Sequence, residues 1–234
     1  MLELYLIRHG QSTWNKTGRI QGQTDVPLSE EGVRQAEALA KRLKDWVFDK
    51  VYSSDLKRAK QTADIAFGHA AMILDKRLRE IHLGDFQGRT WNEMTDAERD
   101  VFSVQFAGPY HHKVPGGESN DDLRDRALAW LAELPREGRV LAFTHGGFIV
   151  SVLQSVVGRP EPRHWKSMEG WGFWIENTSL TKLLLEEKFK TISVVSDHSH
   201  LETLREEKAK LRSEAQHDDL EVESKKAQEG TKIR

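Results

Sequence analysis

The chain has 234 residues, of which 38% are hydrophobic and 31% charged, and its formal net charge is −2. These values are typical of one globular domain with room for an appendage, and the balance of charge argues against nucleic acid as a partner. The absence of cysteine excludes disulfides, thiolate metal sites and cysteine nucleophiles. We find neither a secretory leader nor an apolar run that could span a membrane, so we expect a cytoplasmic protein without a membrane partner.

Predicted strands and helices alternate along most of the chain. The first is a short apolar strand over residues 2–7, and Ser29 is a suitable N-cap for the first helix. The elements after this helix are a strand over 49–54, a helix over 54–66, a strand over 71–75, a helix over 118–135, a strand over 138–147, a helix over 147–158 and strands over 172–187 and 190–197. Because such alternation favours parallel pairing, we expect a three-layer α/β/α domain with a mostly parallel sheet.

Helical spacing of apolar residues also predicts which helix faces are buried. The predicted buried set is Val33, Ala36, Leu39, Ala40 and Leu43 on the first helix, and Leu123, Ala127, Leu128 and Leu131 on the helix over 118–135.

Two segments depart from the alternation. Residues 83–117 carry aromatic side chains, two histidines and a glycine-rich turn, and we interpret them as a small inserted cap within a domain of residues 1–201. Residues 202–234 mix both signs of charge without an aromatic side chain, which predicts a charged C-terminal helix or tail. A solvated tail and a helix that forms a homodimer through Leu201, Leu204 and Leu211 are the two alternatives.

Histidines end two of the predicted strands. His9 follows Arg8 at the end of the first strand, and His145 lies near the end of the strand over 138–147, just before its two glycines. Parallel strands end at one edge of a sheet, where ligands bind, so both imidazoles should lie there with Arg58 and Glu80. Taken singly, each of these residues has an ordinary structural explanation, such as a surface ion pair or a solvated carboxylate. Together they predict an anion site with a candidate general acid.

Six motifs in order give the sequence a resemblance to the histidine phosphatase superfamily, the phosphoglycerate-mutase-like proteins. They are "RHGQSTWN", "GRIQGQTDVPLSEEG", "VYSSDLKRAKQTA", "LREIHLGDFQG", "PGGES" and "THGG", within residues 1–201. The resemblance implies that His9 is the phosphorylated nucleophile and Glu80 the acid/base. It further implies a phosphate pocket of Arg8, Arg58 and His145, substrate contacts by Asn15, Gln21 and Gly22, and a backbone N–H from Gly146.

These roles are chemically consistent. A neutral His9 can attack phosphorus if its other nitrogen is held by a backbone carbonyl near Gly10. Two guanidinium groups and an imidazolium would neutralise the phosphate, and Glu80 would protonate the leaving alkoxide. We therefore predict a metal-independent phosphatase, without a cofactor, that hydrolyses small phosphorylated metabolites through a phosphohistidine. A phosphoglycerate mutase and a non-catalytic phosphate- or protein-binding relative are the alternatives. The "IHLGDFQG" after Glu80 resembles the phosphatase branch, because mutases carry longer insertions and extra basic residues there.

Several other side chains are weaker candidates. They are His111 and His112, which could reach substrate from the cap, His198 and His200, which lack a third metal ligand nearby in sequence, and Trp14, Trp165, Trp171 and Trp174, which could wall a pocket.

Overall fold

A computed structural model describes residues 1–68, 72–107, 110–158, 172–206 and 209–210. Within these ranges no helix has the length and apolar character needed to cross a membrane. Residues 1–198 form one compact unit, and the residues from Ser199 on form a second that begins with the 3₁₀ turn η4 (Ser199–Leu201). Most of the predicted charged tail, from residue 211, lies outside the described residues, as do Trp165 and Trp171.

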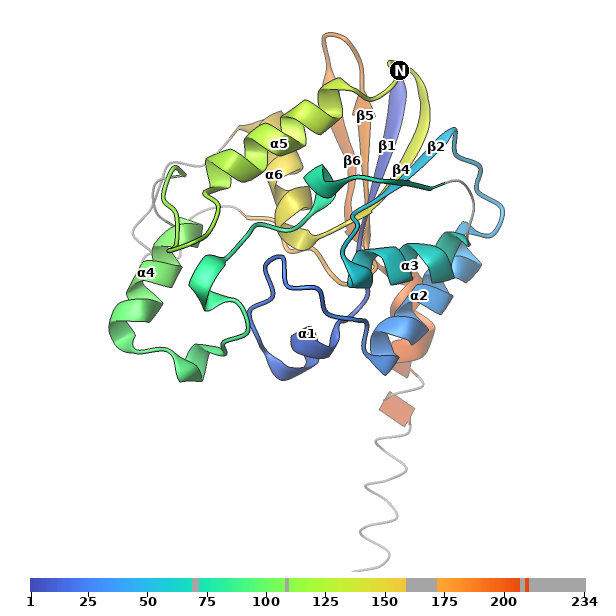
Figure 1. Ribbon diagram of the computed structural model, residues 1–234. Helices are drawn as coiled ribbons and strands as arrows, with labels where there is room; N and C mark the ends of the chain where they lie inside the picture. The colour runs from blue at the N-terminus through green and yellow to red at the C-terminus, as the bar shows by residue number, and fades with distance from the viewer. Residues whose placement is uncertain (69–71, 108–109, 159–171, 207–208, 211–234) are drawn as a thin grey trace, which may run out of the picture. The chain divides into compact units, whose positions relative to one another are not determined.

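The first unit contains a six-stranded sheet with helices between its strands (Figure 1). The strands are β1 (Leu2–Arg8), β2 (Lys50–Ser53), β3 (Met72–Leu74), β4 (Gly138–Thr144), β5 (Leu180–Leu185) and β6 (Lys190–Asp197). The helices are α1 (Thr13–Thr17), α2 (Glu30–Leu43), α3 (Lys57–Phe67), α4 (Asp96–Ala107), α5 (Asn120–Ala132) and α6 (Gly146–Val157), with short 3₁₀ turns η1 (Lys76–Leu78), η2 (Gly84–Phe86) and η3 (Trp91–Glu93).

The strand order is β3-β2-β4-β1-β5-β6, and the first four of these strands are parallel. In the central pair, Arg8 of β1 lies opposite Thr144 of β4. The residues that follow, His9 and His145, therefore leave the sheet side by side. β5 is antiparallel to both of its neighbours, β1 and β6. Because the other pairs are parallel, the predicted three-layer α/β/α fold with a mostly parallel sheet is confirmed.

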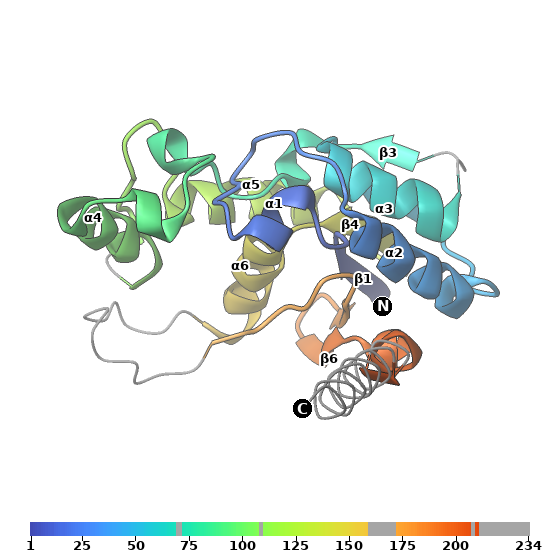
Figure 2. The same cartoon turned by 90° about the horizontal axis from the view of Figure 1, so that it is seen from below.

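Alternate residues of the central strands face two separate cores. Leu4 and Leu6 of β1 belong to the cluster that α5 and α6 cover, whereas Tyr5 and Ile7 belong to the cluster that α2 and α3 cover. Figures 1 and 2 show these two helix pairs on opposite faces of the sheet. A strand buried on both faces reads as a continuous apolar run, which is why the sequence of β1 is so hydrophobic.

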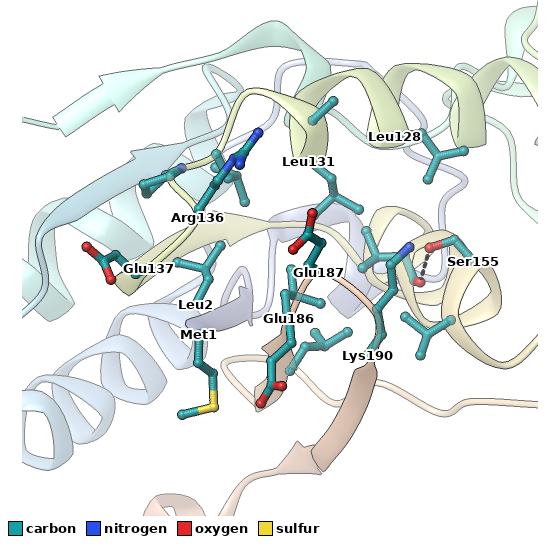
Figure 3. Close-up of a pocket in the computed structure, with 17 residues that line it drawn as sticks. Met1, Leu2, Leu128, Leu131, Arg136, Glu137, Ser155, Glu186, Glu187 and Lys190 are labelled. Atoms are coloured by element: carbon teal, nitrogen blue, oxygen red, sulfur yellow. Dashed lines mark hydrogen bonds between the residues drawn. The ribbon is translucent and has the colours of Figure 1, made fainter.

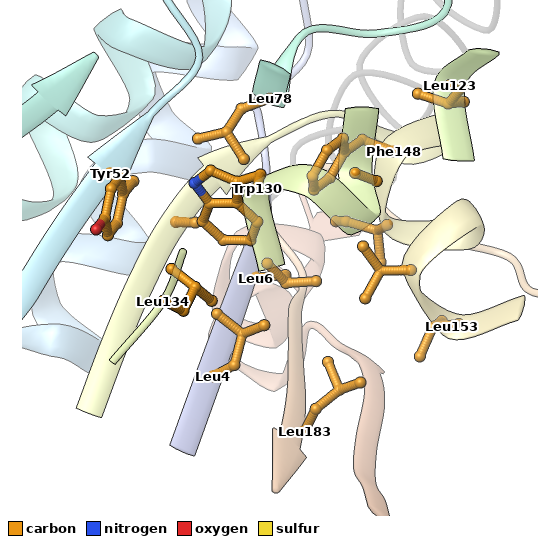
Figure 4. Packing of buried hydrophobic residues seen from close by; sticks show 14 of the residues in the cluster. Leu4, Leu6, Tyr52, Leu78, Leu123, Trp130, Leu134, Phe148, Leu153 and Leu183 are labelled. Carbon is orange, nitrogen blue, oxygen red and sulfur yellow. The ribbon is translucent and has the colours of Figure 1, made fainter. Parts of the chain in front are cut away.

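The core under α5 is built around Trp130, which is 1% exposed. Its ring makes edge contacts with Tyr52 and Phe148, at centroid distances of 5.5 and 5.8 Å (Figure 4). We expected Leu128 to be buried instead, and this was wrong because Leu128 is 37% exposed. The spacing fits both residues, and the larger indole gains more from burial. Val33 of α2, also predicted to be buried, is 36% exposed.

Two further predictions are refined by the structure. The strand predicted over 172–187 covers only Leu180–Leu185, because Thr178 has a positive φ of 54° that breaks extended backbone. In the predicted cap, η2, η3 and α4 lie around a small core of Phe86, Met94 and Val114.

Candidate active site

His9 leaves the sheet directly after β1, and its ring is buried with 2% exposure. Its backbone N–H donates to Thr144 of β4 at 2.9 Å, and its carbonyl accepts from the Asn177 side chain at 2.9 Å. The ring Nδ1 lies 2.7 Å from the Gly10 carbonyl oxygen, which is the backbone orientation that we predicted. Hydrogen bonds on both sides of β1 thus fix the backbone that carries this imidazole.

Arg58, the second residue of α3, determines the tautomer of His9. Its side chain is fully buried, and its Nε lies 3.3 Å from Nε2 of His9. A guanidinium can only donate, so Nε2 must be the acceptor and Nδ1 must carry the proton given to Gly10. The two terminal nitrogens of Arg58 donate to the carbonyls of Gly22 and Thr24 at 2.7 and 2.8 Å.

Burial and the nearby cations keep the imidazole of His9 neutral. Burial lowers the pKa of His9 well below its ordinary value of 6.5, and the nearby cations Arg58 and Arg8 lower it further. Burial also lowers the pKa of Arg58, to about 10, so its guanidinium stays charged at neutral pH. The site therefore combines a neutral imidazole, whose Nε2 carries no proton and accepts only the 3.3 Å hydrogen bond from Arg58, with a fixed positive charge.

His145 lies beside His9, with ring centroids 5.1 Å apart. We expected an imidazolium here, and this was wrong: burial, followed by Arg58 and His9, lowers the pKa of His145 well below 6.5. Its Nε2 lies 2.9 Å from the Ser54 hydroxyl, and its buried Nδ1 has no partner among the described residues. His145 can thus offer a hydrogen bond to an anion, whereas the positive charge comes from the two arginines.

Arg8 and Glu80 come from different segments of the chain, and their side chains interact electrostatically beside His9. The Arg8 side chain donates from one terminal nitrogen to the Ile175 carbonyl, and its buried Nε has no partner among the described residues. Burial lowers the pKa of Arg8, and the neighbouring Glu80 carboxylate opposes this effect. Glu80 accepts from the backbone N–H of Gly147 at 3.0 Å and from that of Ile81 at 3.0 Å.

Arg126 of α5 holds the segment that carries Glu80. Its guanidinium donates to three backbone carbonyls, those of Arg77, Arg79 and Glu80, at 2.6–2.8 Å. Glu118 pairs with the same guanidinium at 3.0 Å and also accepts from the backbone N–H of His82 at 2.9 Å. This pair therefore fixes the backbone on both sides of Glu80.

Arg8, His9, Arg58 and Glu80 line one cavity of about 230 Å³, whereas His145 and Arg126 are not among its lining residues. Its lining comprises Arg8, His9, Ile20, Gln21, Gly22, Arg58, Glu80, Ile81, Leu83, Phe102 and Gly147. A neutral imidazole with an available nitrogen, two guanidinium groups and a carboxyl group converge here. Such a set can bind an anion, attack it and exchange a proton with the group that leaves.

Comparison with known proteins agrees with this geometry. The family model described as "Histidine phosphatase superfamily (branch 1)" matches residues 4–198. The chain belongs to the histidine phosphatase superfamily. This confirms the family that the six motifs indicated.

Three relatives show how much of the histidine phosphatase fold is shared. Phosphoglycerate mutase-like protein 4 of Arabidopsis thaliana is 37% identical over 209 residues, which cover 86% of this chain and 87% of that protein. The structure of Bacillus stearothermophilus YhfR has a TM-score of 0.75 at 32% identity, covering 86% of this chain and all of that one. Phosphoserine phosphatase of Entamoeba histolytica, solved with 3-phosphoglyceric acid, has a TM-score of 0.69 at 28% identity, with coverage of 86% and 100%.

The predicted substrate contacts of this member of the histidine phosphatase superfamily lie in different places. Gln21 and Gly22 line the cavity, and Gln21 accepts a hydrogen bond from the Ser12 hydroxyl at 2.7 Å. Asn15 is not among the lining residues, and its side-chain oxygen accepts from Ser12 as part of the N-terminal cap of α1. Gly146 is the first residue of α6, where an added Cβ would lie 3.6 Å from Nε of Arg8.

The weaker candidates lie away from the cavity lining. His111 and Trp174 are exposed, His112 and Trp14 are half-buried, and none of them lines the cavity. Nδ1 of His198 lies 2.8 Å from the Ser196 carbonyl oxygen. Within the described ranges, no group of three or more His, Asp or Glu residues could hold a metal ion, so a metal site at His198 and His200 gains no support.

A larger groove, of about 1010 Å³, lies at the opposite end of β1 (Figure 3). Its lining combines leucines, such as Leu2 and Leu131, with charged residues that include Arg136 and Lys190. Among the described residues that line it there is no histidine, and the hydroxyl of Ser155 donates to the Val152 carbonyl at 2.7 Å. This groove lacks the nucleophile and the paired cations of the cavity at His9.

Some residues of the cavity escaped sequence analysis. Gly147 was noted only as the last residue of the motif "THGG", yet its N–H donates to the Glu80 carboxylate. Arg126, which lies behind the cavity lining, looks like any helical arginine in the sequence. Its partner Glu118 lies within the motif "PGGES", but the motif does not indicate this ion pair. Ile20 and Phe102 carried no signal beyond hydrophobicity.

Proposed function

We propose that this histidine phosphatase hydrolyses small phosphate monoesters through a phosphorylated His9, without a metal or another cofactor. The observation that carries the proposal is the fixed tautomer of His9. Its Nδ1 proton is directed to Gly10, and its unprotonated Nε2 borders a cavity with Arg8, Arg58 and Glu80.

The reaction would proceed in two displacements. Nε2 of His9 attacks phosphorus, the N–P bond forms and the ester P–O bond breaks, while Glu80 gives a proton to the leaving alkoxide. Glu80 then takes a proton from water, whose oxygen attacks phosphorus as the N–P bond breaks and inorganic phosphate forms. Arg8 and Arg58 stabilise the charge on the phosphoryl oxygens, and a hydrogen bond from His145 would assist them.

A phosphoglycerate mutase is the second candidate, favoured by the name of the Arabidopsis relative. Both activities use a phosphohistidine, and they differ in the acceptor, which is water for the phosphatase and a second hydroxyl for the mutase. A non-catalytic relative of the family would show neither activity. The segment from Leu201 on remains a candidate for homodimer formation, which the mass in solution would test.

A screen of phosphate release over a panel of monoesters tests the proposal, with 2,3-bisphosphoglycerate-dependent mutase activity measured in parallel. We expect phosphate release that survives dialysis against EDTA. Isomerisation of phosphoglycerate faster than its hydrolysis would favour the mutase, and activity restored only by added metal would contradict the metal-independent mechanism.

A further inference from the structure

The lining of the cavity at His9 combines two chemically different sets of residues. The polar set comprises Arg8, His9, Gln21, Arg58 and Glu80. The apolar set comprises Ile20, Ile81, Leu83 and Phe102. If the phosphoryl group is bound by the polar set, within reach of Nε2 of His9, the alcohol part of the ester has the apolar set to contact in the rest of the cavity.

The apolar set is held in place by packing. Ile81 and Leu83 are 4% and 7% exposed and belong to the main core. Phe102 of α4 contacts Phe86 at a ring centroid distance of 5.2 Å, and Ile20 packs against the same small core of the 83–117 segment. This surface is therefore formed before a ligand arrives, which favours binding of a complementary apolar group.

Among the described lining residues, a second negative charge on the substrate would meet no counter-ion other than the two arginines that bind the phosphoryl group. Arg8 and Arg58 are the cationic side chains among the described residues that line the cavity. The arginines of the surrounding segments pair with carboxylates: Arg19 with Glu93 at 3.2 Å, Arg79 with Asp55 at 2.5 Å, Arg89 with Glu98 at 2.7 Å and Arg126 with Glu118 at 3.0 Å. Burying a carboxylate or a second phosphate against Ile, Leu and Phe side chains without a counter-ion is strongly unfavourable.

We propose that the preferred substrates are phosphate monoesters of apolar, uncharged alcohols, and that Ile20, Ile81, Leu83 and Phe102 select against a second anionic group. This inference rests on the proposed phosphatase activity and names its substrate class. Each additional methylene buried against this surface should raise kcat/KM about three- to fourfold, until the space is filled.

A matched pair of esters tests the selection. 3-Methylbutyl phosphate and 3-phosphooxypropionate have nearly the same shape, and they differ in carrying an isopropyl group or a carboxylate at the far end. We expect kcat/KM of the wild-type enzyme to be at least tenfold higher for 3-methylbutyl phosphate. An equal kcat/KM for the two esters, or preference for the carboxylate, would overturn the inference while leaving the phosphatase activity standing.

Binding to the His9→Ala protein separates the two proposals. This variant cannot form a phosphohistidine, so calorimetry with each ester reports selection without turnover. If the His9→Ala protein binds 3-methylbutyl phosphate selectively but the wild-type enzyme releases no phosphate, the proposed function is contradicted. The selection for apolar esters is supported by the same result. Phe102→Arg should reduce or reverse the preference for the apolar ester, whereas Phe102→Leu should retain it. Unchanged selectivity in a folded Phe102→Arg protein would contradict the role of Phe102.

Discussion

The guanidinium of Arg126 donates a hydrogen bond to the backbone carbonyl of Glu80 at 2.8 Å. The same side chain binds the two carbonyls of Arg77 and Arg79 and pairs with Glu118. A helix of the main domain thus sets the position of the proposed general acid, although Arg126 itself does not line the cavity.

Replacing Arg126 by lysine should impair proton transfer more than phosphate binding. One ammonium cannot reach three carbonyls in the planar arrangement of a guanidinium, so the Glu80 segment should shift. We expect kcat/KM for alkyl phosphates to fall by about 10–100-fold, because small misplacements of a catalytic group have effects of this size. For p-nitrophenyl phosphate, whose leaving group needs no proton, the fall should be much smaller. Arg124→Lys, on the exposed side of the same helix, is the control, and an equal loss for both classes of ester would contradict a positioning role.

Glu80→Gln removes the transferable proton itself. The amide oxygen can still accept from Gly147 or Ile81, so the local structure should persist. General acid catalysis contributes about 10²–10⁴-fold, and we expect a loss in this range for alkyl phosphates. The measurement is the dependence of kcat/KM on the pKa of the leaving alcohol, which should become steeper in the variant. A slope that does not change would mean that another group protonates the alcohol.

The two glycines at the start of α6 should respond differently to alanine. A Cβ on Gly147 would lie 2.2 Å from the Glu80 carboxylate, whereas one on Gly146 would lie 3.6 Å from the nearest atom of Arg8. Gly147→Ala must displace Glu80, and we expect a loss of about 10–100-fold in kcat/KM for alkyl phosphates. Gly146→Ala keeps its N–H and should lose far less, so steady-state kinetics that rank the two variants in the reverse order would contradict this geometry.

The buried histidines should make stability depend on pH. The pKa values of His9 and His145 are lowered well below 6.5 in the folded protein, so below pH 6.5 the unfolded chain binds protons that the folded chain does not. The free energy of unfolding should therefore fall as the pH falls, by about 2–3 kcal/mol between pH 7.5 and 5.5 for the two groups. Urea unfolding measures this change. His145→Gln should remove about half of it and the exposed-site control His111→Gln none, while equal pH dependence in wild type and His145→Gln would argue against a neutral His145.

The sequence was most informative where several levels of structure agree. An apolar run followed by His9 and Gly10 predicts both a buried parallel strand and a group at its carboxyl end, and pairing with β4 then places His145 beside it. The charge state of His145 was not predictable, because it depends on complete burial next to Arg58. The contacts of Arg126 and Phe102 were also hidden, since each requires knowing how distant segments pack around residues 77–83. Leu128 and Trp130 show a further limit: helical spacing fits both residues, and the fit of side chains in the core decides between them.

Trapping of a phosphoenzyme tests the central proposal most directly. The enzyme would be mixed with a ³²P-labelled monoester, quenched rapidly without acid and digested, and the labelled peptide sequenced. We predict an acid-labile, base-stable label on His9, which appears at a rate at least equal to kcat and is absent from His9→Ala. A wild-type enzyme that turns over with no labelled intermediate, or a His9→Ala enzyme that hydrolyses the ester at a rate near that of wild type, would contradict it.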